Sequence, residues 1–184
     1  MRTITHTRAN LWRLIAWGGA AALLLAPLIA MQFSDEAQWT AFDFIVAGVM
    51  LAVPLGVLEL TLRATGNLAY RAGVAVALGT GLVMTWINLA VGIIGNENNP
   101  LNQMFFGVLL VGVAGAFVAK FRPRGMAAAM VTTAVAQGAA AVVALIGGYF
   151  VVPLIGAFAV MWLFSAWLFH KAAIQTRAAP APEV

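Results

Sequence analysis

The chain has 184 residues, of which 63% are hydrophobic and 9% are charged, and its mean hydropathy is +0.96. Because a soluble domain carries charge on roughly a quarter of its residues, this composition excludes an ordinary soluble domain and indicates a protein of the lipid bilayer. The formal net charge is +4, but the basic residues are spread over four short segments rather than along one helix face, which argues against nucleic acid as a partner. The chain contains no cysteine, which excludes disulfides, thiolate catalysis, iron–sulfur clusters and covalently attached haem.

Six apolar segments are each long enough to cross the hydrocarbon core of a bilayer, which is about 30 Å thick and requires roughly 20 residues of helix. They cover residues 11–31, 40–62, 70–95, 100–121, 125–147 and 150–170. The first is interpreted as a span rather than a signal peptide, because its apolar run is too long and no Ala-x-Ala type of site follows it. The sequence therefore predicts an all-α fold: a polytopic transmembrane helical bundle of six spans in a single membrane domain over residues 1–184, with a disordered cytoplasmic tail over 171–184.

The positive charges fall on one side of this arrangement. All ten Lys and Arg residues lie near the start of the first span, around the gap between the second and third spans, in the gap between the fourth and fifth, or after the sixth. The outer gaps hold the acidic residues Asp35, Glu36, Asp43 and Glu97. Because short loops rich in Lys and Arg stay in the cytoplasm, both termini are predicted to be cytoplasmic.

Two helix starts can be predicted from residues at the outer boundaries. Thr40 followed three residues later by Asp43 resembles a capping box. Asn99 followed by Pro100 is typical of an N-cap and the first helical position. The Gly147-Gly148 pair marks the turn between the last two spans, where no charged residue separates them, so this boundary rests mainly on total length.

Small residues at four-residue spacing predict where helices pack closely, because small side chains let helix backbones approach. Gly73, Ala77 and Gly81 form such a seam on the third span, and Gly112 with Ala116 forms one on the fourth. These seams are expected to meet other helices, within this chain or in a partner. The fifth span is almost entirely Ala, Gly, Thr and Val, whereas the sixth carries several aromatic side chains. We therefore expect the fifth span at the centre of the bundle and the sixth at its periphery.

Glu59 is an acidic residue in the inner half of the second predicted span. It follows Thr40 by 19 residues, so at 1.5 Å per residue it lies about 28 Å along the second helix, close to the cytoplasmic face. Arg63 follows at i+4 and can pair with it. We favour an interfacial ion pair over a coupling or gating carboxylate. Pro54 in the same span is expected to kink the helix.

Uncharged polar side chains inside the spans include Asn88 and Gln137. Thr85 and Asn88 are three residues apart, and Thr133 and Gln137 are four apart, so each pair shares one helix face. Hydrogen bonds between such helix faces are the preferred interpretation, and a solute or ion pathway is the alternative.

No cofactor or metal is expected. Calcium favours carboxylate and amide oxygens, and eight side chains on or near the outer loops carry them: Asp35, Glu36, Asp43, Asn96, Glu97, Asn98, Asn99 and Asn102. Their spacing matches no calcium loop, and a solvated, helix-capping loop is preferred. Only His6 and His170 exist, one in the N-terminal tail and one at the end of the last span, so bis-histidine haem ligation within the bilayer is not expected. No catalytic constellation or phosphate loop occurs, and the chain is predicted not to be an enzyme.

Three segments carry a resemblance to a protein family. They are Trp86-Ile-Asn-Leu-Ala-Val-Gly-Ile-Ile-Gly, Asn99-Pro100 and Phe121-Arg-Pro-Arg-Gly-Met. They resemble segments of an uncharacterised family of small six-span bacterial integral membrane proteins, over a stretch from about Met31 to the sixth span. The resemblance implies a protein of the bacterial cytoplasmic (inner) membrane, and no activity is attached to it.

Two functions follow as hypotheses. The first is a non-catalytic integral membrane protein that serves as an accessory or assembly subunit of a larger membrane complex, with the lipid bilayer and other membrane protein chains as its partners. The alternative is a small transporter or channel for a neutral or weakly polar solute, with Asn88, Gln137 and the kink at Pro54 along its path.

Overall fold

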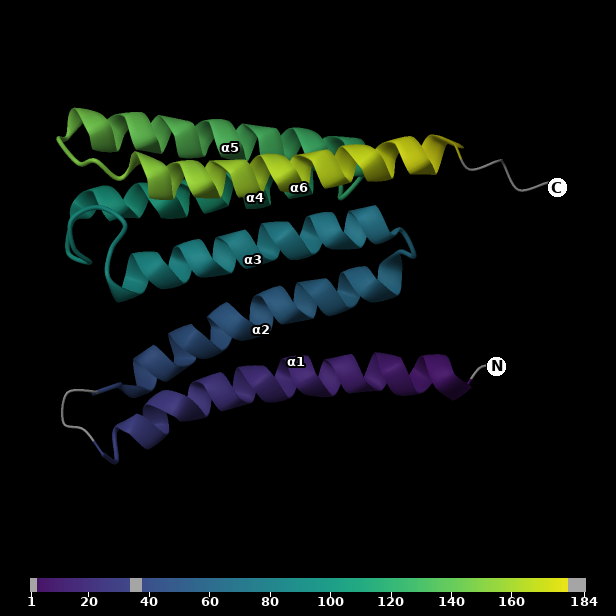
Figure 1. Cartoon of the computed structure of the whole chain (residues 1–184), viewed down its shortest axis with the longest axis horizontal. Helices are drawn as coiled ribbons and strands as arrows, with labels where there is room; N and C mark the ends of the chain where they lie inside the picture. Colours follow the sequence, from purple (N-terminus) through teal and green to yellow (C-terminus); the bar gives the residue numbers. More distant parts are fainter. Residues whose placement is uncertain (1–2, 34–37, 179–184) are drawn as a thin grey trace. The chain divides into compact units, whose positions relative to one another are not determined.

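The computed structural model describes residues 3–33 and 38–178, with side chains described from residue 11 onward. These residues form six α-helices and one short 3-10 helix, and no strand occurs among them (Figure 1). In chain order the elements are α1 (Thr3–Ala30), α2 (Ala41–Ala64), α3 (Leu68–Ala90), η1 (Pro100–Gln103), α4 (Met104–Val118), α5 (Pro123–Ile146) and α6 (Val152–Ala178). Within this part of the chain six helical segments, with η1 and α4 counted as one, are long and apolar enough to cross a membrane. The chain is thus an all-α protein with the helices of a small membrane protein.

The predicted helix starts are confirmed at the level of hydrogen bonds. At the start of α2, the backbone N–H of Thr40 donates to Asp43 Oδ2 at 2.7 Å, and the N–H of Asp43 donates to Thr40 Oγ1 at 3.4 Å. This reciprocal pair is a capping box. At the start of η1, the side chain of Asn99 accepts a hydrogen bond from the N–H of Leu101 at 3.0 Å. Each cap satisfies backbone donors that the first helical turn leaves free.

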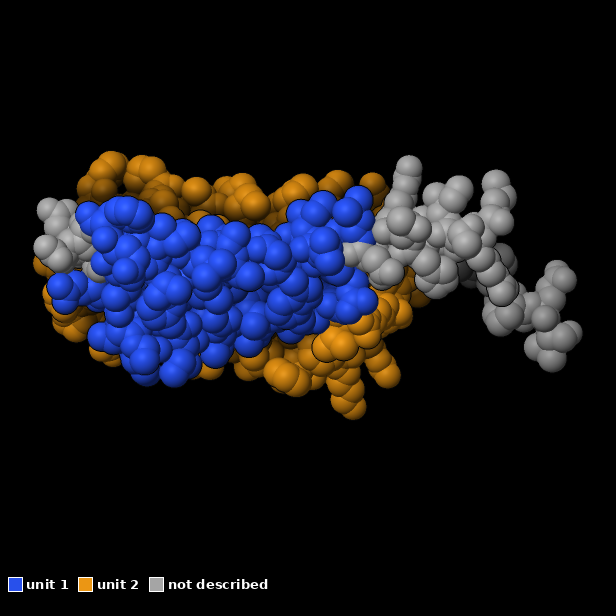
Figure 2. All heavy atoms as spheres, turned by 90° about the horizontal axis from the view of Figure 1, so that it is seen from below, with its two compact units in different colours: residues 1–59 blue, residues 60–184 orange. Residues whose placement is uncertain are grey.

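The chain divides into two compact units, coloured separately in Figure 2. The first, Met1–Glu59, contains α1 and most of α2 and is called the hairpin unit here. The second, Leu60–Val184, contains the end of α2 and all of α3 to α6 and is called the bundle unit. Each unit is described by itself below.

The hairpin unit is open along part of its length. A hollow of about 450 Å³ lies between its two helices and is lined by apolar side chains of α1 and α2: Ala21, Leu24, Leu25, Leu28 and Phe44. Farther along α2 the helices approach, because a Cβ added at Gly48 would lie 3.9 Å from Leu24 Cδ1. Few residues of the unit are buried, namely Ala20, Ala47 and Leu51 among those described.

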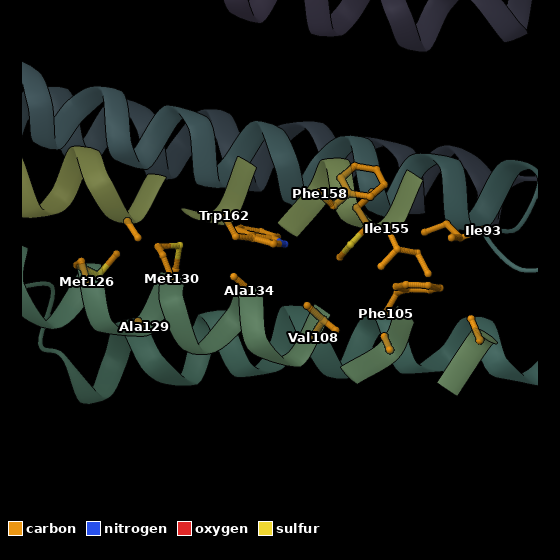
Figure 3. Close-up of a cluster of buried hydrophobic side chains, with 14 of the residues drawn as sticks. Ile93, Phe105, Val108, Met126, Ala129, Met130, Ala134, Ile155, Phe158 and Trp162 are labelled. Atoms are coloured by element: carbon orange, nitrogen blue, oxygen red, sulfur yellow. The ribbon is translucent and has the colours of Figure 1, made fainter. Parts of the chain in front are cut away.

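In the bundle unit α6 packs against both α5 and α3, and α5 packs against α4. Figure 3 shows side chains of α4, α5 and α6 directed toward one another, with Phe105, Met130 and Trp162 among them. The expectation that the sixth span is peripheral is therefore wrong. Its aromatic side chains are accommodated because α3 offers glycine opposite them: a Cβ added at Gly73 would lie 3.2 Å from the ring of Phe169.

Two helix ends differ from the apolar runs in the sequence. Helix α3 ends at Ala90, although the apolar run continues to Gly95. The chain turns at Gly92, whose φ is +75° and where an added Cβ would lie 2.4 Å from the backbone of Asn96, so that only glycine fits. Helix α6 continues to Ala178, so residues 171–178 of the predicted disordered tail are helical. Residues 179–184 lie outside the described residues.

Candidate functional site

Glu59 is held by two side chains of α1 within the hairpin unit. Arg13 Nη2 lies 2.8 Å from Glu59 Oε1, and Trp17 Nε1 donates a hydrogen bond to Glu59 Oε2 at 3.1 Å. The side chain of Glu59 is 12% exposed, compared with 44% for Arg13. Within this unit the ion pair crosses from α2 to α1, and the pair with Arg63 that local spacing predicts stays a prediction. The carboxylate therefore joins the two helices of the unit, and this arrangement fits an ion pair with a structural role.

The predicted seam on α3 lies against α6 in the same chain. A Cβ added at Gly81 would lie 3.7 Å from the ring of Trp162 on α6 and 3.2 Å from Leu109 Cδ2 on α4. Ala77 is partly buried against the same core. Across from Gly73, the hydroxyl of Ser165 donates to the carbonyl oxygen of Gly73 at 2.8 Å, and this side chain is fully buried. The seam thus brings α3 and α6 close enough for a hydrogen bond to the helix backbone.

The second predicted seam lies against α5. A Cβ added at Gly112 would lie 3.1 Å from Thr133 Oγ1, and Ala116 is partly buried against the core. Helices α4 and α5 approach more closely at Gly115, which is not among the predicted seam residues. A Cβ added there would lie 2.8 Å from Ala129 Cβ. Its signal in the sequence is the spacing of three residues from Gly112, which also repeats along a helix face.

Gln137 lies fully buried on α5, and neither atom of its amide group has a hydrogen-bond partner among the described residues. The indole N–H of Trp162 on α6 is likewise buried without a partner. Both residues lie about 15 Å, at 1.5 Å per residue, from the ends of α5 and α6 that face the turn between these helices. An unsatisfied buried amide costs roughly 1–3 kcal/mol. Two unsatisfied groups therefore occur at the same depth in the bundle unit.

The threonines of the two predicted polar faces form hydrogen bonds within their own helices rather than across helices. Thr85 Oγ1 donates to the carbonyl of Gly81 at 2.8 Å, and Thr133 Oγ1 donates to that of Ala129 at 2.8 Å, each within its own helix. A threonine hydroxyl readily donates to the carbonyl oxygen four residues earlier on its own helix, so it is not available as a donor to another helix. In the bundle unit, hydrogen bonds between helical elements come from Ser165, which donates to Gly73, and from Asn88, which donates to Asn102 on η1.

Asn88 and Asn102 organise the outer loop that joins α3 to η1. Asn102 is 4% exposed; its Oδ1 accepts from the N–H groups of Ile93 and Ile94 at 3.1 and 2.8 Å. Its Nδ2 donates to the carbonyls of Ile94 and Asn96 at 3.2 and 2.6 Å. Asn88 Nδ2 donates to the backbone oxygen of Asn102 at 3.1 Å, while Asn88 Oδ1 has no partner among the described residues. Asn102, expected in a solvated loop, is a buried residue that shapes it.

A second hollow of about 450 Å³ opens beside this loop. Its lining mixes amide and carboxylate side chains with apolar ones: Asn88, Leu89, Glu97, Asn98, Asn99, Pro100, Asn102, Gln103 and Phe106. Asp35 and Glu36 of the outer oxygen-rich set lie outside the described residues. In the described part of the chain, His, Asp and Glu side chains form no group of three or more that could hold a metal ion.

No protein-family model, no curated protein and no solved structure matches this chain. The resemblance carried by the segments between Trp86 and Met126 stays a prediction. The candidate sites are therefore features of the chain's own geometry. The hairpin unit has an apolar hollow, and the bundle unit has a polar outer hollow and two unsatisfied buried groups.

Proposed function

We propose that this chain is a non-catalytic integral membrane protein of the bacterial inner membrane, with six spans and both termini in the cytoplasm, that acts as an accessory or assembly subunit of a larger membrane complex. Six helices of sufficient length and apolarity support the insertion. The confinement of Lys and Arg to the inner ends of the spans supports the orientation.

The observation that carries the assembly role is a seam on α1. Leu14, Gly18, Ala21, Leu25 and Leu28 follow one another at alternating intervals of four and three residues. This spacing keeps residues on one helix face and is the spacing at which two helices interlock side chains. Three of these residues, Ala21, Leu25 and Leu28, line the apolar hollow of the hairpin unit. At Gly18 an added Cβ would meet no atom within 4 Å.

The chemistry of this seam fits a transmembrane helix of another chain. Leu14 is 75% exposed, and Leu25 and Leu28 are about half exposed, so the seam offers side chains that can enter a partner surface. The hollow beside it offers space that a partner side chain can fill, with a gain of dispersion contacts. In a membrane such packing, rather than the hydrophobic effect, drives helix association.

Adjacent alanines give a matched test. Ala21→Trp fills the hollow, whereas Ala22→Trp places the same side chain on a neighbouring position that does not line it. After extraction in a mild detergent, we expect partner chains to co-purify with the native chain and the Ala22 variant and to be lost from the Ala21 variant. Equal yield of all three chains in the membrane shows that insertion is intact.

Cysteine cross-linking adds an independent readout, because the chain has no cysteine of its own. Gly18→Cys is expected to cross-link to another chain in native membranes, and Ala22→Cys to do so much less. Cross-links from Gly18→Cys only to this chain's own helices, or a native chain that always purifies alone, would overturn the assembly role.

A second function is favoured by the polar groups of the bundle unit: a small transporter or channel for a neutral or weakly polar solute. Asn88 lines the outer hollow, and the unsatisfied amide of Gln137 lies deeper in the same unit. Unsatisfied buried groups call for a partner such as water or a solute. The test is solute uptake by reconstituted vesicles. Uptake that is unchanged in Asn88→Leu and Gln137→Leu removes the residues on which this function rests.

A further inference from the structure

The turn between α4 and α5 carries three basic residues within five positions, Lys120, Arg122 and Arg124 (Figure 1). All three side chains are exposed. Among the described residues no carboxylate forms a salt bridge with any of them, and they are called the basic triad here.

Three other cations of the chain are committed to structural contacts. Arg13 pairs with Glu59. Arg71 donates to the backbone oxygens of Leu62 and Thr65, both at 2.6 Å, and so caps the end of α2. Lys171 lies over the ring of Trp167, 5.5 Å from its centroid. The basic triad thus concentrates charge that the described fold does not use.

The backbone of this turn is held in a defined conformation. Lys120 and Phe121 have φ of 50° and 56°, in the left-handed region that residues other than glycine adopt rarely. The N–H of Phe121 donates to the carbonyl of Ala116 at 3.2 Å, which closes the end of α4. The hydroxyl of Tyr70, on the first turn of α3, donates to the carbonyl of Phe121 at 2.7 Å. The triad is therefore presented by a turn tied to α3 rather than by a loose loop.

Aromatic rings lie beside the triad. Phe117 and Phe121 meet edge to face with their centroids 5.4 Å apart, and they are 66% and 52% exposed. Exposed rings next to cations match the boundary between acyl chains and headgroups, where the rings enter the apolar layer and the cations reach the phosphates. Helix ends reach this depth when the helices span the bilayer.

We infer that the α4–α5 turn is a binding site for the phosphate group of an anionic lipid headgroup, with the basic triad as its ligands and the Tyr70–Phe121 hydrogen bond holding them in place. Guanidinium groups recognise phosphate through paired, charge-assisted hydrogen bonds, which suits a site with two arginines. The inference rests on the membrane insertion proposed above, but not on an assembly partner or a transported solute.

The test uses the full chain in lipid nanodiscs of phosphatidylcholine with a minor fraction of phosphatidylglycerol. Native mass spectrometry of the released protein measures how much phosphatidylglycerol it retains. Because each Lys or Arg near an anionic surface contributes about fivefold, we expect K120Q/R122Q/R124Q to weaken retention on the order of a hundredfold. The control R8Q/K171Q/R177Q removes the same number of charges from the same side of the chain and is expected to retain the lipid.

Two further variants separate a positioned site from general attraction. R122K/R124K keeps every charge but removes the paired hydrogen bonds of both guanidinium groups, and it is expected to weaken retention. Tyr70→Phe keeps every charge, and with it the topology signal, but removes the hydrogen bond to Phe121; it is expected to weaken retention by about fivefold, the contribution of one cation. Equal losses in both triple glutamine variants, or full retention in Tyr70→Phe, would show that no positioned site exists.

A second experiment distinguishes the phosphate of a lipid headgroup from a free phosphate compound. In nanodiscs of phosphatidylcholine alone, inorganic phosphate is titrated while the thermal unfolding of the native chain is followed. We expect no stabilisation by phosphate and clear stabilisation by phosphatidylglycerol. Stabilisation by inorganic phosphate that is lost in K120Q/R122Q/R124Q would assign the site to a free phosphate compound and overturn the lipid headgroup. Loss of a co-purifying partner leaves each of these readouts unchanged, so the two proposals fail independently.

Discussion

Ser165 on α6 donates a hydrogen bond from its side chain to the backbone oxygen of Gly73 on α3, 2.8 Å away. Glycine permits this approach, and one turn farther along α6 the ring of Phe169 lies where a side chain of residue 73 would be. The contact explains why α6 lies inside the bundle unit despite its bulk.

Gly73→Val is expected to lower the free energy of unfolding by about 1–3 kcal/mol, the usual cost of overpacking, because the new side chain meets the ring of Phe169. Gly79→Val on the same helix is the control, since a Cβ there meets no atom within 4 Å. Both substitutions change the helix propensity by the same amount. Thermal unfolding in detergent compares them, and equal midpoints would contradict the packing of α3 on α6.

Asn102→Ala is expected to destabilise the outer loop by roughly 3 kcal/mol or more, because it leaves two buried N–H groups and two carbonyls without their partner. Asn98→Ala, at an exposed position of the same loop, should cost little. Amide hydrogen exchange is the measurement: Ile93 and Ile94 should lose protection in the first variant only. Protection that survives in Asn102→Ala would show that its side chain does not hold the loop.

Glu59 and Arg13 are expected to couple by about 1 kcal/mol in a double-mutant cycle, the upper range for pairs of partly exposed charges. The cycle uses Glu59→Gln and Arg13→Gln, with unfolding of the chain in detergent as the readout. A parallel cycle pairs Arg13→Gln with Asp43→Asn, which changes a carboxylate 16 residues away from Glu59 on α2 and is expected to show no coupling. Equal coupling energies in the two cycles would contradict the ion pair between α1 and α2.

Gln137→Leu is expected to raise the free energy of unfolding by about 1–3 kcal/mol, because it replaces an unsatisfied buried amide with an apolar group of similar volume. Gln103→Leu, at an exposed position, serves as the comparison. The same variant is informative for transport, since a stabilised chain that no longer carries solute would separate function from folding. Destabilisation by Gln137→Leu would show that the amide has a partner in the folded protein, such as a bound water.

The proposed orientation makes a prediction about two loops. Cysteine introduced at exposed Asn98 should react with a membrane-impermeant thiol reagent added to intact cells, whereas cysteine at exposed Gly66 should react only after the membrane is opened. The absence of native cysteine keeps the background low. Labelling of both positions from the same side would contradict the six-span topology.

The helices could be predicted because membrane spans are determined by length and apolarity, which a single sequence displays directly. The caps at Thr40 and Asn99 could be predicted for the same reason: an N-cap acts within three residues of itself. Asn102 was assigned to a solvated loop because its partners, Ile93 and Ile94, meet it only after the chain turns at Gly92.

Long-range contacts were harder to predict. Glu59 pairs with Arg13 on another helix, and local spacing can predict only partners on the same helix. The bulk of the α6 side chains predicts a peripheral helix, but the glycines that face them on α3 make room for these side chains inside the bundle unit. Gln137 was identified as a polar residue of interest, but its lack of hydrogen-bond partners depends on how α5 and α6 are packed and rotated against each other.

The approach of α4 to α5 at Gly115 constrains how this protein can change during evolution. A side chain at position 115 would collide with Ala129, 2.8 Å from the added Cβ, so the two positions together have room for one methyl group. Substitutions at either position are therefore expected to be tolerated in pairs, with a larger residue at 115 accompanied by glycine at 129. The same reciprocity should link residue 73 to residue 169, so the helix contacts of the bundle unit should appear as correlated changes in residue size among its homologues.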